Sequence, residues 1–587
     1  MRYLAIHSET LSTALASGIN ELYTLNENRI LDNVFHKKVK FISGVDKFSK
    51  IEVEDFTYLN KIYELELESL SNTLNIYHNK NISILNWEIL LGPWLRIFVF
   101  VLYQKWVLIN LIKNKNKYSL LLAKSKLSQV IPNGFSDFHE LIGTQEWNDY
   151  IDTLIAESVE IDFDYIPIKL KKRRERKIKK KTVIFKLKKY IKKIIYSFYN
   201  IFSNKKILIT GVTQLTSIIS IIFIFFRVTP FAIKAKSIDR LFNIKVDRSF
   251  RSYNKNTLHK DDFQNFLNAV IKLSIPRFYL EDYNTRVLSV AKWWPKQNKF
   301  EYVFTSTSHW NDDFFKLWLS ISESNSRKLI ILQHGGTYGT TRLPIHQEYI
   351  EKKISDYYLT WGWEEAGKNT VPFISNISLL KGCCNYFSKK SDNILIISTR
   401  VKCYSKGDPW DSSLWNESYV ENIIYTINRV NELFENNSLL RLHPSQNLSS
   451  ESYYKFLKAK VINIRFDAEK NIEKSIFHSK LNIVTQNSTV LLQCLLWNLP
   501  VMAYWSEILS PLNNDAKKYF GLLEDVGIFH KNPKSLIDSI SDIDIWWNSN
   551  KVQNARVKFC HKYINSSVNN VFSAMSVIKK RRKYTNE

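Results

Sequence analysis

Short runs of apolar residues alternate with helical patterns through the last two thirds of the chain. Tyr302–Thr305 and Lys328–Gln333 are two such runs, and small or polar residues follow each of them. Near residue 385 the pattern restarts with Asn393–Thr399, a run typical of a strand buried on both faces. Because strands that alternate with helices indicate parallel sheets, the pattern predicts an α/β protein with two Rossmann-type domains that face each other across a cleft.

Four further runs in the second array are predicted strands: Leu439–Leu442, Val461–Arg465, Leu481–Thr485 and Pro500–Tyr504. In open parallel sheets, ligands bind beyond the carboxyl ends of the strands. The residues that follow each strand are therefore the first candidates for a functional site.

The domain boundaries follow from the same pattern. We predict a mostly helical N-terminal region at 1–150, a basic amphipathic insertion or linker at 151–205, a first Rossmann-like domain at 206–385, a second at 386–545, and a C-terminal helix with a basic tail at 546–587. Within the N-terminal region, Gly92-Pro93 predicts a break between two helices, since proline suits the first turn of a helix.

The uncharged segment Ile207–Phe226 is long enough to span a bilayer. Its polar residues and the Thr210-Gly211 pair favour another interpretation. We predict a short strand, a turn and a buried helix.

Positive charge is concentrated in one place. The chain has a net charge of +27, and Lys169–Lys193 contains fifteen Lys or Arg residues against one Glu, a net charge of +14. This local concentration argues against a nucleic-acid-binding surface along the whole protein. The run, which becomes amphipathic after Thr182, is either a helix that lies on an anionic membrane or a solvated insertion.

The N-terminus has no signal-peptide pattern, and the five cysteines form no CxxC motif. We therefore expect a cytoplasmic protein, peripheral on the inner face of the cytoplasmic membrane if the basic run binds lipid.

A glycine loop, Gln333–Thr340, directly follows a predicted strand. Gly335 and Gly336 allow a ligand to approach the backbone closely. His334 is suited to accept a proton or to bind phosphate, although an isolated histidine is often structural. The loop is not a Walker motif, because no Gly-Lys-Ser/Thr follows it.

Two motifs of the second array are candidates for phosphate binding. Arg441 and His443, in Arg-Leu-His-Pro, follow one predicted strand. Ser488 and Thr489 follow another and begin a helix, where they either cap the helix or help its free N–H groups to hold a phosphate.

Glu348, Glu351 and Asp356 follow the glycine loop and are candidates for a general base, or else surface and capping carboxylates. Asp162-Phe163-Asp164 and Asp542-Ile543-Asp544 match the DxD pattern of metal-dependent transferases, but neither follows a convincing nucleotide-binding strand. We interpret both as structural and expect neither a metal ion nor a cofactor.

Several blocks resemble a family of transferases from bacterial surface-polysaccharide and nonulosonate loci. The glycine loop with Tyr338, and Ile354–Trp363 with its Trp-Gly-Trp, form the most specific block. Trp87–Leu95 and residues between Gly527 and Phe559 are similar to its two ends. The family is more distantly similar to capsule Kdo transferases, bacterial sialyltransferases and teichoic-acid glycerophosphotransferases.

This resemblance implies a GT-B-like fold and a glycosyltransferase that uses a nucleotide-activated sugar, with CMP-linked Kdo or another nonulosonate as the expected donor and a glycan or lipid-linked hydroxyl as the acceptor. It implies that His443, Ser488 and Thr489 hold the donor phosphate. From the residues themselves we expect Arg441 beside them, and His334, with Glu348 or Asp356, to face the acceptor. Gln493 stands where the resemblance leads us to expect a glutamate that contacts the ribose. The alternatives are a CDP-alditol phosphotransferase and an inactive glycan- or membrane-binding scaffold.

Overall fold

The computed structural model describes most of the chain. The described residues are 2–17, 22–25, 39–42, 51–115, 117–166, 203–212, 215–226, 229–233, 245–252, 262–296, 299–321, 327–378, 391–401, 404–408, 416–444, 451–507, 510–565 and 567–580. The basic run Lys169–Lys193, which the sequence analysis assigned to membrane or solvent, lies outside them.

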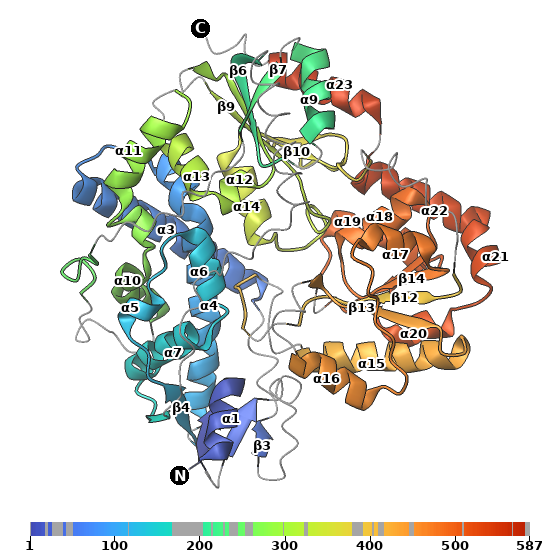
Figure 1. The fold of residues 1–587 in the computed structure, drawn as a ribbon, viewed down its shortest axis with the longest axis horizontal. Helices are drawn as coiled ribbons and strands as arrows, with labels where there is room; N and C mark the ends of the chain where they lie inside the picture. Colours follow the sequence, from blue (N-terminus) through green and yellow to red (C-terminus); the bar gives the residue numbers. More distant parts are fainter. Residues whose placement is uncertain are drawn as a thin grey trace, which may run out of the picture.

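The N-terminal region combines the expected helices with a parallel sheet that the sequence analysis did not predict (Figure 1). Its elements are β1 (Tyr3–Ala5), α1 (Ser8–Ala16), β2 (Leu22–Leu25), β3 (Val39–Ile42), α3 (Val53–His78), α4 (Ile84–Asn114), β4 (Ser119–Ala123), α5 (Leu127–Val130), α6 (Phe135–Leu141), α7 (Gln145–Val159) and β5 (Phe163–Ile166). The strand order is β3-β2-β1-β4-β5. Strands this short give little periodicity to recognise. Residue 150 falls inside α7, so the N-terminal region continues to the end of β5.

Helix α4 continues through Gly92-Pro93, where the sequence analysis predicted a break. A proline inside a helix costs about 3 kcal/mol, but burial of the surrounding side chains outweighs this cost. By length and composition α4 is the one described helix that could cross a bilayer, yet 67% of its most apolar window is buried. This burial is typical of a core helix.

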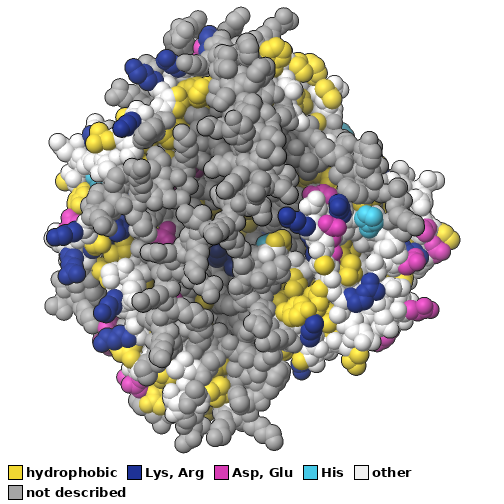
Figure 2. Space-filling view, in the orientation of Figure 1, with side chains coloured by type: hydrophobic (Ala, Val, Ile, Leu, Met, Phe, Trp, Pro, Cys, Tyr) yellow, Lys and Arg dark blue, Asp and Glu magenta, His cyan; other side chains and the backbone are white. Residues whose placement is uncertain are grey.

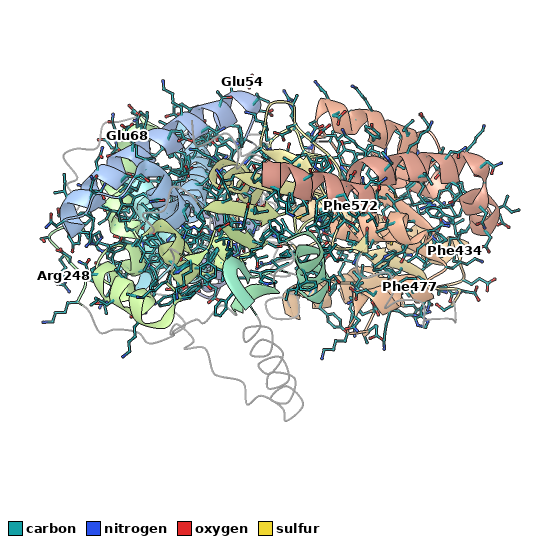
Figure 3. All side chains as sticks on the ribbon, turned by 90° about the horizontal axis from the view of Figure 1, so that it is seen from above. Glu54, Glu68, Arg248, Phe434, Phe477 and Phe572 are labelled. Atoms are coloured by element: carbon teal, nitrogen blue, oxygen red, sulfur yellow. The ribbon has the colours of Figure 1, made fainter. Side chains whose placement is uncertain are left out.

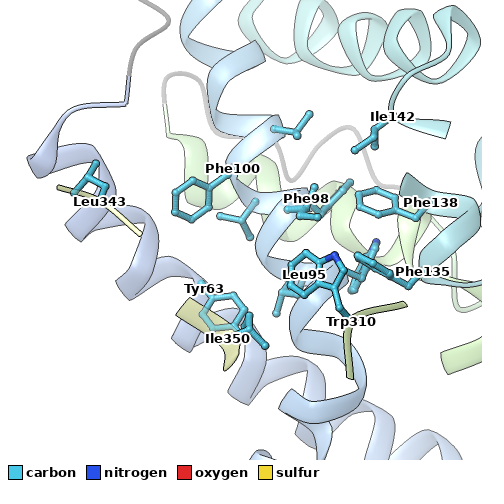
Figure 4. Packing of buried hydrophobic residues seen from close by; sticks show 14 of the residues in the cluster. Tyr63, Leu95, Phe98, Phe100, Phe135, Phe138, Ile142, Trp310, Leu343 and Ile350 are labelled. Atoms are coloured by element: carbon cyan, nitrogen blue, oxygen red, sulfur yellow. The ribbon is translucent and has the colours of Figure 1, made fainter. Parts of the chain in front are cut away.

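The helices of the N-terminal region share a core with the next domain (Figure 4). Tyr63 of α3, Leu95 of α4 and Phe138 of α6 belong to the same buried cluster as Trp310 and Ile350, which lie far along the chain in the first Rossmann-like domain. The N-terminal region is therefore packed against that domain rather than tethered to it.

The first Rossmann-like domain is built on a six-stranded parallel sheet with the order β11-β10-β9-β8-β6-β7. Its elements are β6 (Ser203–Thr210), α9 (Leu215–Phe226), β7 (Thr229–Ile233), α10 (Phe263–Ser274), η2 (Arg277–Tyr279), α11 (Tyr283–Trp293), β8 (Tyr302–Thr305), α12 (Ser308–Asn311), α13 (Asp313–Ser320), β9 (Lys328–Leu332), α14 (His346–Ile354), β10 (Tyr357–Thr360) and β11 (Thr370–Pro372). The segment Ile207–Phe226 forms β6 and α9, which confirms the predicted strand, turn and helix.

The second Rossmann-like domain has a five-stranded parallel sheet with the order β13-β12-β14-β15-β16. Its elements are β12 (Ile394–Ile397), α15 (Asn416–Leu433), β13 (Ser438–Arg441), α16 (Glu451–Lys460), α17 (Ile472–His478), β14 (Leu481–Val484), α18 (Thr489–Trp497), β15 (Val501–Tyr504), α19 (Asn514–Glu524), β16 (Phe529–His530) and α20 (Pro533–Asp538). Val461–Arg465 is not a strand, because Asn463 is left-handed with φ of 59° and interrupts the extended backbone. The fifth strand is β16 instead.

The C-terminal helices are divided between the two Rossmann-like domains. They are α21 (Ile543–Asn548), α22 (Asn550–Tyr563) and α23 (Val568–Lys580). Helix α22 packs on α18 and α19, whereas α23 returns to the first domain, where Val571 and Met575 share a buried cluster with β6 and β9. The expected GT-B-like architecture, two parallel-sheet domains with a helical N-terminal region, is therefore present.

Candidate functional site

The glycine loop of the first domain touches the start of helix α18 in the second. The Gly336 N–H donates a hydrogen bond of 3.0 Å to Oγ1 of Thr489. A Cβ atom at Gly336 would lie 2.6 Å from the backbone nitrogen of Thr489, closer than any side chain allows. Glycine is required here by this close approach of two backbones. The structure thus brings together two motifs that are 153 residues apart.

Further contacts extend this seam between the domains. The Asn487 side chain donates to Oγ1 of Thr340 at 2.9 Å, and the Asn513 side chain donates to the Gly339 carbonyl at 2.9 Å. Thr341 and Leu512 form an antiparallel bridge. The loops that follow β9 and β14 therefore face each other, so the carboxyl edges of the two sheets meet at this seam.

Gln333 connects the glycine loop to the Trp-Gly-Trp block. Its Oε1 accepts hydrogen bonds from the Trp361 N–H at 2.8 Å and from the Trp363 ring N–H at 2.9 Å, and its Nε2 donates to the Gly335 carbonyl at 2.8 Å. One buried amide therefore holds both halves of the block in place, which explains physically why these residues occur together.

His334 lies on a network of buried groups. Its Nδ1 is 3.6 Å from Oε1 of Glu351, and the same oxygen is 2.9 Å from Nε2 of His309. On the other side of the ring, Nε2 of His334 is 3.3 Å from the hydroxyl of Tyr338, which also donates to Gln347. A base oriented by a carboxylate is a recurring arrangement in enzymes.

Burial controls the protonation of this network. It raises the pKa of Glu351 to about 8 and lowers the pKa of His309 to about 3. Burial also lowers the pKa of His334, while the Glu351 carboxylate opposes this shift. At neutral pH His334 is therefore uncharged and able to take up a proton. Glu351 is itself protonated at this pH, so it stabilises the resulting cation only by releasing its own proton.

The other two acidic candidates have different partners. Glu348 is buried and accepts hydrogen bonds from the Gly339 N–H at 3.2 Å and from Lys352 at 3.1 Å, so it holds the glycine loop. Asp356 accepts from the Leu329 N–H at 2.7 Å and pairs with Lys328, at the amino end of β9. The structure brings Glu351, and not Asp356, to His334.

On the second side of the seam, in the second Rossmann-like domain, Ser488 precedes helix α18. Ser488 occupies the N-cap position but makes no capping hydrogen bond, and its buried Oγ has no hydrogen-bond partner. Thr489 receives the Gly336 N–H instead. The first N–H groups of a helix attract anions when no side chain caps them. Gln493, one turn later, is 7% exposed.

Basic residues follow the strands next to β14. His443 is exposed after β13, and Arg400 is half-buried after β12, the strand between β13 and β14. No described residue forms a hydrogen bond or ion pair with the Arg400 guanidinium. Sequence reasoning missed Arg400, although its position directly after a predicted strand was the available signal.

The guanidinium of Arg441 already has partners within the second Rossmann-like domain. Its guanidinium pairs with Asp467 and donates to Ser475 Oγ at 3.0 Å and to the Glu469 carbonyl at 2.9 Å. Arg441 is buried in this network. Because its donors are already used within the domain, the structure corrects the expectation that Arg441 holds the donor phosphate.

A group that has metal-ligand geometry lies elsewhere, at the carboxyl edge of the N-terminal sheet. Ligand atoms of His7, Asp149 and Asp152 lie within 4.8 Å of one another, and all three residues are buried. His7 and Lys105 already pair with Asp152, at 2.7 and 2.9 Å. We therefore interpret the three residues as part of an internal network of ion pairs that joins β1, α4 and α7.

Solved structures with a similar fold are distant in sequence. The wall teichoic acid polymerase TagF, in a structure with CDPG, is 12% identical, and the match covers 68% of this chain and 97% of TagF with a TM-score of 0.32. MnaA of S. aureus with UDP is 8% identical, covering 65% and 98%, with a TM-score of 0.37. UDP-GlcNAc 2-epimerase of Neisseria meningitidis, bound to UDP-GlcNAc, is 11% identical, covering 64% and 99%, with a TM-score of 0.35. Similarity at this level gives no argument for a shared activity.

Sequence comparison finds no match among curated proteins. A family model, by contrast, matches residues 22–576, which include the glycine loop, the Trp-Gly-Trp block and both phosphate-binding candidates. Since this match spans nearly the whole chain, the protein belongs to the LIC12162 family of transferases.

Proposed function

We propose that this transferase moves a sugar from a nucleotide-activated donor to a hydroxyl of a growing glycan or lipid-linked acceptor, in the cytoplasm. The expected donor is CMP-linked Kdo or another nonulosonate, by the resemblance described above. One observation carries the proposal: the Gly336–Thr489 contact joins the loop that carries His334, a partly buried neutral base, to the uncapped start of α18.

We assign the donor phosphate to the side of the seam that belongs to the second Rossmann-like domain. The first N–H groups of α18, Ser488, Arg400 and His443 would receive it, and Gln493 would contact the nucleoside. These groups supply positive potential and hydrogen bonds where the leaving phosphate gains charge, so the proposal requires no metal ion.

The acceptor is assigned to the first side. Its hydroxyl oxygen attacks the anomeric carbon, and its proton passes to the imidazole ring of His334. The bond between the anomeric carbon and the phosphate oxygen breaks, and the nucleotide leaves with the electron pair. Glu351, on the Nδ1 side of the ring, then stabilises the imidazolium. Glu348 and Tyr338 position the loop that carries His334.

A CDP-alditol phosphotransferase would use the same phosphate-binding residues. It differs in the bond that breaks, which joins the transferred phosphorus to the oxygen that bridges the two phosphorus atoms. Its product would retain phosphate from the donor, so mass analysis of the product distinguishes the two reactions.

The test is a thermal-shift titration with CMP, CDP, UDP, GDP and ADP, with His443→Ala and Arg400→Ala measured alongside. A ligand that binds the folded state raises the melting temperature by mass action. We expect stabilisation by CMP or CDP that is weakened in both variants. Stabilisation by UDP or GDP would discard the CMP-linked donor, and no stabilisation by any nucleotide would favour the scaffold alternative.

A further inference from the structure

Helices α9 and α23 lie side by side on one face of the first sheet (Figures 1 and 3). The rings of Phe225 and Phe572 are 4.8 Å apart, and Nζ of Lys579 lies 5.0 Å from the ring centre of Phe226. Ile222 of α9 and Ala574 of α23 are fully buried in the cluster beneath them. Each helix therefore has one face packed on the sheet and one face turned outward.

The outward faces are unusually apolar. Phe223 is 54% and Ile224 63% exposed on α9, and Val568 is 61% and Phe572 54% exposed on α23. Figure 2 shows hydrophobic side chains gathered at the upper edge, over these two helices. Single exposed apolar residues are ordinary, but four large apolar side chains exposed on two adjacent helices indicate an interaction surface.

The two helices carry charge of one sign. Neither helix contains an acidic residue, and α23 ends in Lys579 and Lys580. The Lys579 ammonium donates to the Phe225 carbonyl, so the basic C-terminal cluster begins at the end of α9.

One end of the surface lies at the amino edge of the first sheet. The ring of Phe226, the last residue of α9, is 5.1 Å from that of Tyr302, the first residue of β8. The nearby carboxylates of Glu301 and Asp356 are paired with Lys206 and Lys328. The other end, at Val568, is three residues from Asn565, whose N–H donates to the Trp361 carbonyl at 2.7 Å, so Val568 is left unchanged in the test.

We infer that the outward faces of α9 and α23 form a membrane-contact surface for an anionic lipid bilayer. Phe223, Ile224, Val568 and Phe572 enter the headgroup region, and the adjacent lysines attract the lipid phosphates. Apolar insertion together with basic charge is the combination that holds peripheral proteins on anionic membranes. The charge complementarity favours lipid over a second copy of this chain, whose matching surface would be equally basic.

The experiment is co-sedimentation of the full-length protein with vesicles of phosphatidylcholine alone or with about 30% phosphatidylglycerol added, since anionic surface charge attracts basic segments. The variant Phe223→Ser/Ile224→Ser/Phe572→Ser removes three exposed apolar side chains. The matched control, Ile76→Ser/Ile545→Ser, removes apolar side chains that are 82% and 74% exposed on other elements.

We expect binding to the anionic vesicles that falls by about tenfold or more in the triple variant and stays unchanged in the control, because buried apolar area sets interfacial affinity. Nucleotide stabilisation should persist in all variants, which separates this result from the proposed function. The inference is overturned if wild-type protein binds neither vesicle, if the triple variant binds as wild type does, or if the triple substitution instead dissociates a dimer in solution.

Discussion

The two sides of the seam between the Rossmann-like domains differ in how their polar groups are satisfied. On the first side, His334 lies beside Glu351, which is fully buried and connected to the fully buried His309. On the second side, Ser488 has a side-chain oxygen without a partner, and no described residue pairs with the half-buried Arg400 guanidinium. The first side is connected internally, whereas Ser488 and Arg400 on the second side have hydrogen-bonding groups that no described residue uses.

This difference suits a reaction that needs a proton acceptor and a charged donor. A base must be held in one orientation with a shifted pKa, which burial achieves at a cost in stability. A diphosphate or phosphodiester brings its own charge and hydrogen-bond acceptors, so the residues that receive it remain available until it binds. The following experiments test whether the two sides differ in this way.

The largest effect is expected at His334. His334→Ala should lower the rate of transfer by about 10²- to 10⁴-fold, the usual contribution of a general base, with little change in nucleotide binding. Nucleotide release from the donor selected by thermal shift measures the rate. Glu351→Gln should change kcat and its pH profile more than KM. If His334→Ala also abolished nucleotide binding, the assignment of the acceptor to the first side and of the donor to the second side would be incorrect.

The contact between the sides can be broken at Gly336. A methyl group there meets the Thr489 backbone, so Gly336→Ala should destabilise the closed seam by about 1–3 kcal/mol and reduce transfer. Thermal unfolding and kcat/KM measure both effects. Gly521→Ala, on helix α19, is the control, because nothing lies within 4 Å of an added Cβ. Gly521→Ala should leave activity intact. Equal effects of the two substitutions would contradict the inferred close contact between Gly336 and the Thr489 backbone.

The first side should also give the protein a distinctive pH dependence. Between its ordinary pKa of 4.5 and its folded pKa of about 8, Glu351 binds a proton in the folded state only, so the free energy of unfolding falls as pH rises. His309, whose pKa is lowered from 6.5 to about 3, has the opposite effect below pH 6.5. From about pH 6.5 to about pH 8 the effect of His309 is complete, but Glu66, whose pKa is raised to about 7, contributes beside Glu351. Comparison with Glu351→Gln cancels the Glu66 contribution.

In that window, wild-type stability should fall by about 1–2 kcal/mol relative to Glu351→Gln. Urea unfolding of both proteins at the two pH values measures the difference. Parallel pH dependence in the two proteins would show that Glu351 is ionised throughout, and that the first side does not hold a proton.

The smallest effect is expected at Asp356, which the sequence analysis ranked with Glu348 as a base. Asp356→Ala removes the hydrogen bond from the Leu329 N–H and should cost about 1 kcal/mol of stability. Transfer by the folded variant should be unchanged, since the residue lies at the amino end of β9. A large loss of activity in a normally folded Asp356→Ala variant would show that Asp356 takes part in the reaction.

Sequence patterns predicted the elements around the site but not all of the fold. The strands before the glycine loop and before Ser488 are continuous apolar runs, and both are present as β9 and β14. The N-terminal sheet has strands too short to recognise. Gly92-Pro93 misled the helix prediction, since burial of α4 outweighs a local preference.

The sequence by itself determined which residues follow the strands, because apolar periodicity and the glycine and proline positions are local properties of the chain. It therefore located His334, His443 and Ser488. Only the tertiary structure decided their partners: Glu351 lies beside His334, Asp356 lies at the far edge, and Arg441 is used within its own domain while Arg400 is not. These choices depend on how helices and strands pack, and burial and distance between segments far apart in the chain leave no local pattern.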